Sequence, residues 1–361
     1  MKILSFGDLH IYPYHQFSKP EDFGYTTRLN EHVSACKNLA KIIEEISPDV
    51  VCCGGDVFHT QSKVDTIVLD CVSTCLDIIN ETCKKIGVKF DILVGNHDIL
   101  SDNNRSSNSL IPFKKWDNLR IHEIPTVIDD VVYIPYMVEP QRVTSYLKTI
   151  DIKKGKVCLA HLDFRGAKFN DTFIDDQGLE TDIFKDFDLV IGHHYHLPQK
   201  MKNMVFPGSL QVFSFREPRS PYPRGVILYD TETKEVKRIP VVSPDWLTIT
   251  DDSVDIKEEL ESLSKDNYVR LLLSSDFVLS SSGVTEEYIK TKFKGVEIQY
   301  DLNRISAISR IRNRENKEVN LGETEEDSLR EYVNSKATSY SEEEKQELIN
   351  VGISILGKVK E

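Results

Sequence analysis

The stretch Asp-Ile-Leu-Val-Gly-Asn-His-Asp at residues 91–98 decides the fold, because it joins an apolar run to a polar cluster. The run Ile92–Val94 has the β-branched, apolar character of a buried strand. Gly95 then permits a tight turn where the backbone passes close to a bound group. Asn96 supplies a neutral oxygen, and His97 carries a ring that titrates near neutral pH. The pattern is typical of a strand that delivers chemistry at its carboxyl end.

Four further apolar runs end in polar side chains. These runs cover 3–7, 50–55, 156–160 and 188–191, and they lead into Asp8 and His10, into Asp56, into His161, and into His193, His194 and His196. Side chains two residues apart on an extended segment point the same way, so Asp8 and His10 can reach one ion. Alone, Asp56 also fits a turn and Asn96 an Asx turn. Together, carboxylate, imidazole and amide groups form a ligand set suited to Mn, Fe, Zn or Mg.

The spacing of apolar residues predicts an α/β fold. Strands and helices alternate, and the expected elements in chain order are strand 2–7, helix 27–46, strand 49–53, helix 64–86 and strand 89–94. Such a βαβαβ unit implies a parallel sheet with right-handed crossovers. Open α/β sheets place their sites at the carboxyl ends of strands, where Asp8, Asp56 and Asn96 fall. A polar loop is expected at 101–109.

A smaller α/β unit is predicted in the last third of the chain. Its expected elements are helix 255–264, strand 268–274, helix 285–293 and strand 296–302. A polar linker follows, and the end of the chain has apolar residues at helical spacing after a capping box at Ser341 and Glu344. The predicted domains are a metal-binding domain at 1–243, a capping domain at 244–306, a linker at 307–338 and a helical tail at 339–361.

The composition of the chain bounds its class. With 361 residues, 40% hydrophobic and 29% charged, it is typical of a globular protein of more than one domain. No run approaches the about 18 apolar residues of a membrane span, and the amino terminus turns charged too soon for a signal peptide. We therefore expect a cytoplasmic protein that does not enter a membrane. The seven cysteines form no Cys-x-x-Cys pair and are expected to be reduced core thiols.

The formal net charge of −13 argues against a nucleic-acid binder, which usually carries a basic surface. The charge is unevenly spread, however. Acidic residues gather in 322–348, whereas 199–224 carries five Lys and Arg residues, namely Lys200, Lys202, Arg216, Arg219 and Arg224. Bound divalent cations would also offset several carboxylates. A polyanionic substrate therefore stays open.

The order Asp-x-His, Gly-Asp, Gly-Asn-His-Asp, His and His-x-His resembles the calcineurin-like metallophosphoesterase family over about the first 210 residues. The resemblance implies two facing sheets flanked by helices, with a binuclear metal site at the strand ends. It also implies a division of ligands. One ion takes Asp8, His10, Asp56 and His196, and the other takes Asp56, Asn96, His161 and His194, with His97 as the unligated catalytic histidine.

The chain departs from the family at one position. The family has Gly-His-x-His, whereas this sequence has Gly-His-His-Tyr-His at 192–196. Counting from Asp188, the usual spacing assigns the ligand pair to His194 and His196 and leaves His193 where glycine is expected. The alternative uses His193 in a shifted register.

Further motifs resemble one branch of this family, the nuclease subunit of SbcCD-type DNA repair and recombination complexes, including phage versions. These motifs are Phe58-His59 after Gly-Gly-Asp, and His-Leu-Pro-Gln and Phe-Pro-Gly-Ser after the histidine cluster. The resemblance implies a Mn²⁺-dependent DNA nuclease, an exonuclease on duplex ends and an endonuclease on single strands, acting by two-metal hydroxide attack. It implies that the tail docks on an SMC-like ATPase of the SbcC type and that the chain forms a homodimer through helices of the nuclease domain. The helices at 26–47 and 64–86 are the candidates for that contact.

The same resemblance gives roles to two residues. His97 steadies the phosphate or protonates the leaving 3′-oxygen, and His59 contacts the scissile nucleotide. A third residue, Asp98, directly follows His97 and is expected either to orient the His97 ring or to cap a helix.

Two other functions compete with the DNA nuclease. A phosphoesterase for a small phosphodiester or a phosphoprotein agrees with the acidic net charge, whereas the capping domain and the basic stretch Lys200–Arg224 favour DNA. A non-catalytic scaffold for the ATPase is the third, and an intact ligand set argues against it.

Overall fold

A computed structural model describes residues 1–301 except 22–23, 62, 102–103, 151–155, 171, 218–219 and 253–254, together with 329–330, 332–334 and 340–359. The chain divides into two compact units, one made of 1–248, 262–270 and 286–297 and the other of 249–261, 271–285 and 298–361. Most of the linker predicted at 307–338 lies outside the described residues.

Two six-stranded sheets form the core of the first unit, which confirms the predicted α/β class with two sheets. The first sheet has the order β14–β13–β1–β2–β3–β6, in which β1, β2, β3 and β6 are parallel and β13 is antiparallel to β1. Its strands are β1 (Lys2–Phe6), β2 (Val50–Cys53), β3 (Phe90–Leu93), β6 (Leu119–His122), β13 (Gly225–Asp230) and β14 (Val236–Pro240). The second sheet has the order β11–β12–β10–β9–β8–β7. Its strands are β7 (Thr126–Ile128), β8 (Val131–Ile134), β9 (Val157–His161), β10 (Leu189–His193), β11 (Gln199–Met201) and β12 (Met204–Phe206).

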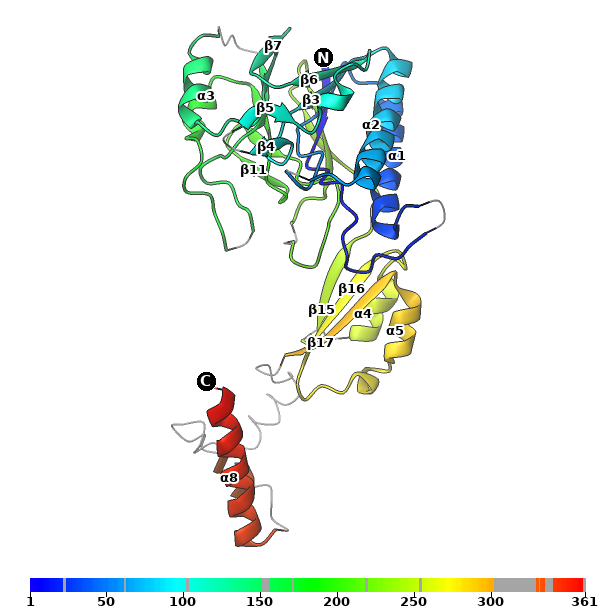
Figure 1. The fold of residues 1–361 in the computed structure, drawn as a ribbon, viewed down its shortest axis with the longest axis vertical. Helices are drawn as coiled ribbons and strands as arrows, with labels where there is room; N and C mark the ends of the chain where they lie inside the picture. Colours follow the sequence, from blue (N-terminus) through cyan, green and yellow to red (C-terminus); the bar gives the residue numbers. More distant parts are fainter. Residues whose placement is uncertain are drawn as a thin grey trace. The chain divides into compact units, whose positions relative to one another are not determined.

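Helices α1 (Thr27–Ile46) and α2 (Thr66–Ile86) lie side by side and pack on the first sheet (Figure 1). Thr26 begins α1 because its side chain accepts a hydrogen bond from the backbone N–H of Leu29. Gly87 ends α2 in the left-handed conformation, with φ 80°, that glycine adopts at little cost. All seven cysteines are buried and free, as predicted. The predicted βαβαβ unit is therefore confirmed.

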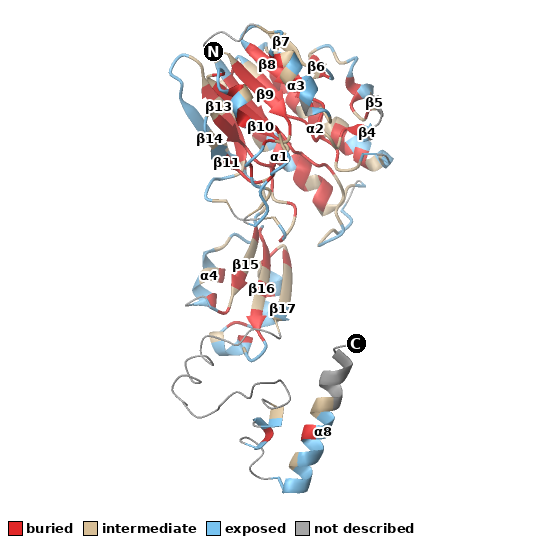
Figure 2. Cartoon of the chain, turned by 90° about the vertical axis from the view of Figure 1, so that its left-hand side faces the viewer, coloured by how far each residue is buried: buried red, intermediate tan, exposed pale blue. Residues whose placement is uncertain are grey.

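The space between the two sheets is filled by side chains from alternate strand positions. Ile3 on β1 and Leu189 and Ile191 on β10 belong to this inter-sheet core. The same alternation places Ser5 and His193 on the inter-sheet face, one step closer to the strand ends. Both are fully buried, and Figure 2 shows β10 in the colour of buried residues. The inter-sheet core thus becomes polar at the end where the site forms.

Shorter elements complete the described chain. A polar hairpin, β4 (Ile99–Ser101) with β5 (Asn104–Asn108), takes the place of the loop predicted at 101–109, so that prediction was wrong. The other elements are η1 (Ile111–Phe113), α3 (Pro140–Leu147), η2 (Thr181–Phe184), β15 (Trp246–Thr250), α4 (Ile256–Ser262), β16 (Tyr268–Ser274), η3 (Leu279–Ser282), α5 (Glu286–Lys292), β17 (Gly295–Asp301) and α8 (Glu342–Val359). Strands β15, β16 and β17 form a three-stranded sheet.

Helix α8 begins at the predicted capping box. The backbone N–H of Glu344 donates to Ser341 Oγ at 3.3 Å, and the N–H of Ser341 donates to Glu344 Oε2 at 2.7 Å. Throughout the described part of the chain, every helix lacks either the length or the apolar character that crossing a membrane demands.

Candidate metal centre

The loops that follow β1, β2 and β10 hold their polar residues in an unusual backbone conformation. Asp8, His10, Asp56 and His194 have φ values of 52°, 41°, 51° and 92°. Non-glycine residues with positive φ are uncommon, and they gather at functional sites. Hydrogen bonds hold the loops together, because Asp8 N donates to Gly55 O and His10 N donates to Asp56 O, both at 2.9 Å. These bonds fix the two loops that carry Asp8, His10 and Asp56 relative to each other.

Asp8, His10 and His196 form the first group of metal-ligating side chains, with ligand atoms within 4.8 Å of one another. His10 Nε2 and His196 Nε2 are 2.9 Å apart. Asp8 Oδ2 is buried, and within the described residues it has no hydrogen-bond partner. A buried carboxylate oxygen without a donor beside two converging imidazoles fits a divalent cation.

Asp56, His161 and His194 form the second group. Asn96 joins it, because its Oδ1 lies 3.0 Å from His161 Nε2 and 2.9 Å from His194 Nδ1. Asp56 Oδ2 lies 3.5 Å from His161 Nε2 and also 3.5 Å from His10 Nε2 of the first group. One carboxylate oxygen therefore faces both groups, as a ligand shared by two ions must.

Electrostatics keep Asp56 in the charged form that a ligand needs. Burial opposes its ionisation, but His161 and His10 hold the pKa of Asp56 well below its ordinary value. Burial likewise opposes the charged form of His161, and the nearby Asp56 nevertheless raises the pKa of His161 to about 9. A bound cation would stabilise the ionised carboxylate of Asp56 in place of these imidazoles.

His97 and His59 lie next to the first group. The backbone N–H of His97 donates to Asp56 Oδ1 at 2.8 Å. The ring nitrogen His97 Nδ1 lies 2.7 Å from the carbonyl oxygen of His59. Since a carbonyl only accepts, His97 Nδ1 carries a proton and Nε2 is the nitrogen left for chemistry. His59 Nδ1 lies 3.4 Å from His10 Nδ1, so His59 contacts the His10 ring on its Nδ1 side. Burial, and then the neighbouring His97, lower the pKa of His59.

The role expected for Asp98 was wrong. Its carboxylate accepts hydrogen bonds from the backbone N–H groups of Val57, Phe58 and Gly95 at 3.0, 3.1 and 3.0 Å. It precedes strand β4 rather than a helix, and the His59 carbonyl orients the His97 ring. Burial, and then Asp56, raise the pKa of Asp98 to about 7. Asp98 therefore positions the two loops that carry Asp56 and Asn96.

Two carboxylates that the sequence did not single out support the histidine ligands. Asp163 Oδ1 lies 2.9 Å from His194 Nε2, and Glu217 Oε1 lies 3.2 Å from His196 Nδ1. Glu217 also pairs with Arg224 at 3.0 Å. Burial opposes the charged form of His196, yet Glu217 raises its pKa. Metal-ligating histidines commonly donate their second N–H to such a carboxylate.

The basic stretch that favoured DNA is partly used inside the fold. Arg224 is mostly covered and pairs with Glu217, and Lys202 pairs with Asp182 at 2.7 Å. Arg219 lies outside the described residues, whereas Lys200 and Arg216 are exposed. The stretch therefore offers fewer free cations than its sequence indicates.

Replacing Glu217 by Gln tests the support of His196. We expect metal affinity at one of the two ion positions to fall about 10–100-fold, because the partner that fixes the tautomer of His196 loses its charge. Titration of the metal-free protein with Mn²⁺ measures this affinity. Asp182→Asn, which removes an exposed carboxylate paired with Lys202, is the matched control and should leave Mn²⁺ binding unchanged. Equal Mn²⁺ affinities for Glu217→Gln and the wild type would contradict the role.

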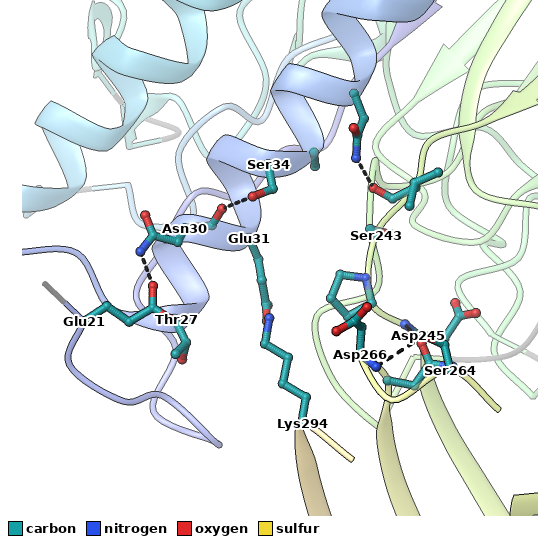
Figure 3. A pocket seen from close by; sticks show the side chains of 15 residues that line it. Glu21, Thr27, Asn30, Glu31, Ser34, Ser243, Asp245, Ser264, Asp266 and Lys294 are labelled. Atoms are coloured by element: carbon teal, nitrogen blue, oxygen red, sulfur yellow. Dashed lines mark hydrogen bonds and ion pairs between the residues drawn. The ribbon is translucent and has the colours of Figure 1, made fainter. Parts of the chain in front are cut away.

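A polar pocket of about 620 Å³ lies beside α1, and none of the predicted ligands lines it (Figure 3). Glu31 points from α1 toward Lys294, with Oε1 and Nζ 2.6 Å apart. Glu31 also pairs with Arg28 at 3.0 Å and accepts a hydrogen bond from Tyr268 Oη at 2.5 Å. The charge of this buried carboxylate is thus neutralised within the fold.

His32 on α1 predicts an acid-sensitive stability. Burial, and then the neighbouring Arg28, lower the pKa of His32 to about 3, and Gln211 Nε2 lies 2.8 Å from His32 Nδ1. Between about pH 6.5 and 3 the unfolded chain binds a proton at His32 that the folded chain does not, so stability falls with falling pH, by about 1.4 kcal/mol per pH unit. His32→Gln should reduce this slope. Urea unfolding of the metal-free protein from about pH 7.5 to 4.5 measures it, and parallel curves would contradict the expectation.

The part of the chain that carries both groups of ligands is similar to known proteins. The model of the family described as calcineurin-like phosphoesterase matches residues 1–219. The protein named "Putative phosphoesterase 244L" of Invertebrate iridescent virus 6 is 29% identical over 219 residues, which cover 56% of this chain and 72% of the viral protein. The similarity to the crystal structure of calcineurin-like phosphoesterase YfkN from Bacillus subtilis extends over 58% of this chain and 81% of the YfkN chain, at 15% identity and a TM-score of 0.32. The region matched by the family contains both groups of ligands.

Proposed function

The chain belongs to the calcineurin-like phosphoesterase family, and from that premise we propose that the phosphoester it hydrolyses is a phosphodiester bond of DNA. The observation that carries the catalytic part is the placement of Asp56. Its Oδ2 faces His10 of the first group and His161 of the second at the same distance of 3.5 Å. That arrangement supports a pair of divalent ions, for which we propose Mn²⁺.

The chain's own residues divide the work of hydrolysis. When bound, a pair of divalent ions supplies the positive charge that polarises a phosphoester and lowers the pKa of an attacking water. Asp8, His10 and His196 would hold one of the two ions. Asn96, His161 and His194 would hold the other. His97 keeps Nδ1–H on the His59 carbonyl, so a protonated ring has Nε2–H left to give to the leaving oxygen.

An aromatic loop beside the second group supports a nucleic-acid substrate. The Phe169 ring lies 5.8 Å from the His194 ring and 5.4 Å from the Phe173 ring. Phe173 is 58% exposed. Exposed aromatic rings next to a phosphate site are suited to stacking on unpaired bases. A phosphoserine or an alkyl phosphodiester offers no ring on which Phe173 could stack, whereas every base of a single strand does.

We further propose that an SMC-like ATPase brings DNA to this site in double-strand-break repair or recombination. With a net charge of −13, the chain alone attracts DNA weakly. Helix α8 carries Leu348 and Val351 exposed by 45% and 55%, which supports α8 as the segment that docks on the ATPase. The homodimer through α1 and α2 belongs to the same proposal.

Cleavage assays test the substrate. End-labelled duplex and single-stranded DNA, and an aryl phosphodiester, are incubated with Mn²⁺ or Mg²⁺ and the wild type, with and without the ATPase subunit. We expect Mn²⁺-dependent cutting of DNA. Phe173→Ala should lower DNA cutting about tenfold through lost stacking while leaving the aryl substrate unaffected. Hydrolysis of the aryl substrate without DNA cutting under either condition would leave a small phosphodiester as the substrate, which the acidic net charge favours.

A further inference from the structure

His193 occupies a position that neither group of ligands uses. It is the last residue of β10, is fully buried, and points into the space between the two sheets. Its ring lies directly against the loops after β1 and β2. A Cβ added to Gly54 would lie 2.0 Å from His193 Cγ, and one added to Gly7 would lie 2.6 Å from His193 Nδ1. The two glycines therefore leave the room that the imidazole fills.

The two ring nitrogens of His193 face different partners. Nε2 lies 2.9 Å from Ser5 Oγ on β1. Nδ1 lies 3.7 Å from Asp8 Oδ2, the buried carboxylate oxygen of the first group, which is beyond hydrogen-bond distance. Within the described residues neither of these two buried atoms has a hydrogen-bond partner. The other oxygen, Asp8 Oδ1, accepts a hydrogen bond from the backbone N–H of His194 at 3.1 Å. Two consecutive residues therefore lie next to the Asp8 carboxylate, namely His193 at the end of β10 and His194 in the loop that follows.

We propose that His193 is a positioning residue for Asp8. With the Ser5 hydroxyl donating to Nε2, the ring carries its proton on Nδ1 and directs it at the Asp8 carboxylate. At 3.7 Å this N–H acts on Asp8 Oδ2 through its partial positive charge and not through a hydrogen bond, and it favours the orientation in which that oxygen faces the first group. The inference rests on the proposed two-metal site and is independent of DNA as the substrate.

Three substitutions separate a directed N–H from simple space filling. The substitution His193→Asn places a side-chain amide near the position of Nδ1, toward Asp8. His193→Gln places the same amide one bond further, near Nε2 and Ser5, and His193→Leu fills space without any donor. We expect His193→Leu and His193→Gln to weaken one Mn²⁺ site about 10–100-fold and to spare the other, whereas His193→Asn stays near the wild type.

The measurement is calorimetric titration of the full-length metal-free protein with Mn²⁺, with electron paramagnetic resonance of the bound Mn²⁺ pair and the melting temperature of the metal-free protein. Wild-type Mn²⁺ binding by His193→Leu would overturn the proposal, and so would equal losses in the Asn and Leu variants. If no His193 variant folds, Ser5→Ala decides: a weakened site supports the proposal and an unchanged one overturns it. A wild type that binds no Mn²⁺ would instead reject the two-metal site, and absent DNA cleavage would leave this inference standing.

Discussion

Replacement of Asp56 by alanine is expected to release both divalent ions and to lower phosphodiester hydrolysis by at least about 10³-fold, the scale of losing several kcal/mol of charge stabilisation. The reason lies in its Oδ2, which faces His10 and His161 at 3.5 Å each. Loss of most single ligands weakens one ion position, whereas loss of Asp56 weakens two. The buried and half-buried imidazoles of both groups would then converge without the carboxylate that balances a shared cation.

Metal content and kinetics check this expectation together. Asp56→Asn is the informative companion, since it keeps an oxygen ligand of the kind that Asn96 offers but removes the charge. We expect it to retain more metal than Asp56→Ala and to remain strongly impaired. Asp182→Asn, an exposed carboxylate away from the ligands, controls for net charge. Two ions still bound to Asp56→Ala, measured by elemental analysis after desalting, would contradict the shared-ligand role.

Replacement of His97 by alanine is expected to lower the rate of DNA cleavage by about 10²–10⁴-fold while both ions stay bound. His97 lies outside the two groups that contain a carboxylate, although its ligand atoms also cluster with those of His10 and His59. Its Nδ1 is occupied by the His59 carbonyl at 2.7 Å. In the proposed reaction a protonated His97 ring would give its Nε2–H to the leaving 3′-oxygen. A poor leaving group needs that proton far more than a good one does.

The leaving group makes the prediction specific. With an aryl phosphodiester, whose phenolate leaves without help, His97→Ala should lose much less activity than with DNA. His97→Gln, which keeps a hydrogen-bond donor but cannot transfer a proton, should resemble His97→Ala on DNA. An equal loss on both substrates would instead assign His97 to binding the phosphate. The metal content of each variant is measured as the control. If it is unchanged, the difference in rate between the two substrates reflects the loss of the proton donor.

The sequence could predict the fold and the two groups because the signals are local. Each apolar run is followed directly by its polar residues, and parallel strands bring their carboxyl ends to one edge. Asp8, Asp56 and Asn96 could therefore be expected near one another from their places after β1, β2 and β3, which are neighbours in one sheet. His161 ends β9 of the second sheet, and its place beside them was implied only by the family resemblance. The side chains named as ligands lie where that reasoning puts them.

The supporting contacts could not be predicted, because they join segments far apart in sequence. Glu217 reaches His196 across 21 residues, and Asp163 reaches His194 from the loop after β9. Asp98 binds backbone amides of the loop after β2, so the neighbouring His97 in the motif misled the assignment. The β4–β5 hairpin was missed for another reason: backbone pairing defines it, whereas its side chains are polar.

The positive φ angles at Asp8, His10, Asp56 and His194 carry a cost in the stability of the fold. Each such residue costs about 1–3 kcal/mol, so the four together rival the about 5–15 kcal/mol that holds a domain folded. Mutation would readily relieve that strain with glycine. Glycine at any one of these positions would lower the strain but would also remove a ligand. Stability and metal binding therefore place opposite demands on these four residues.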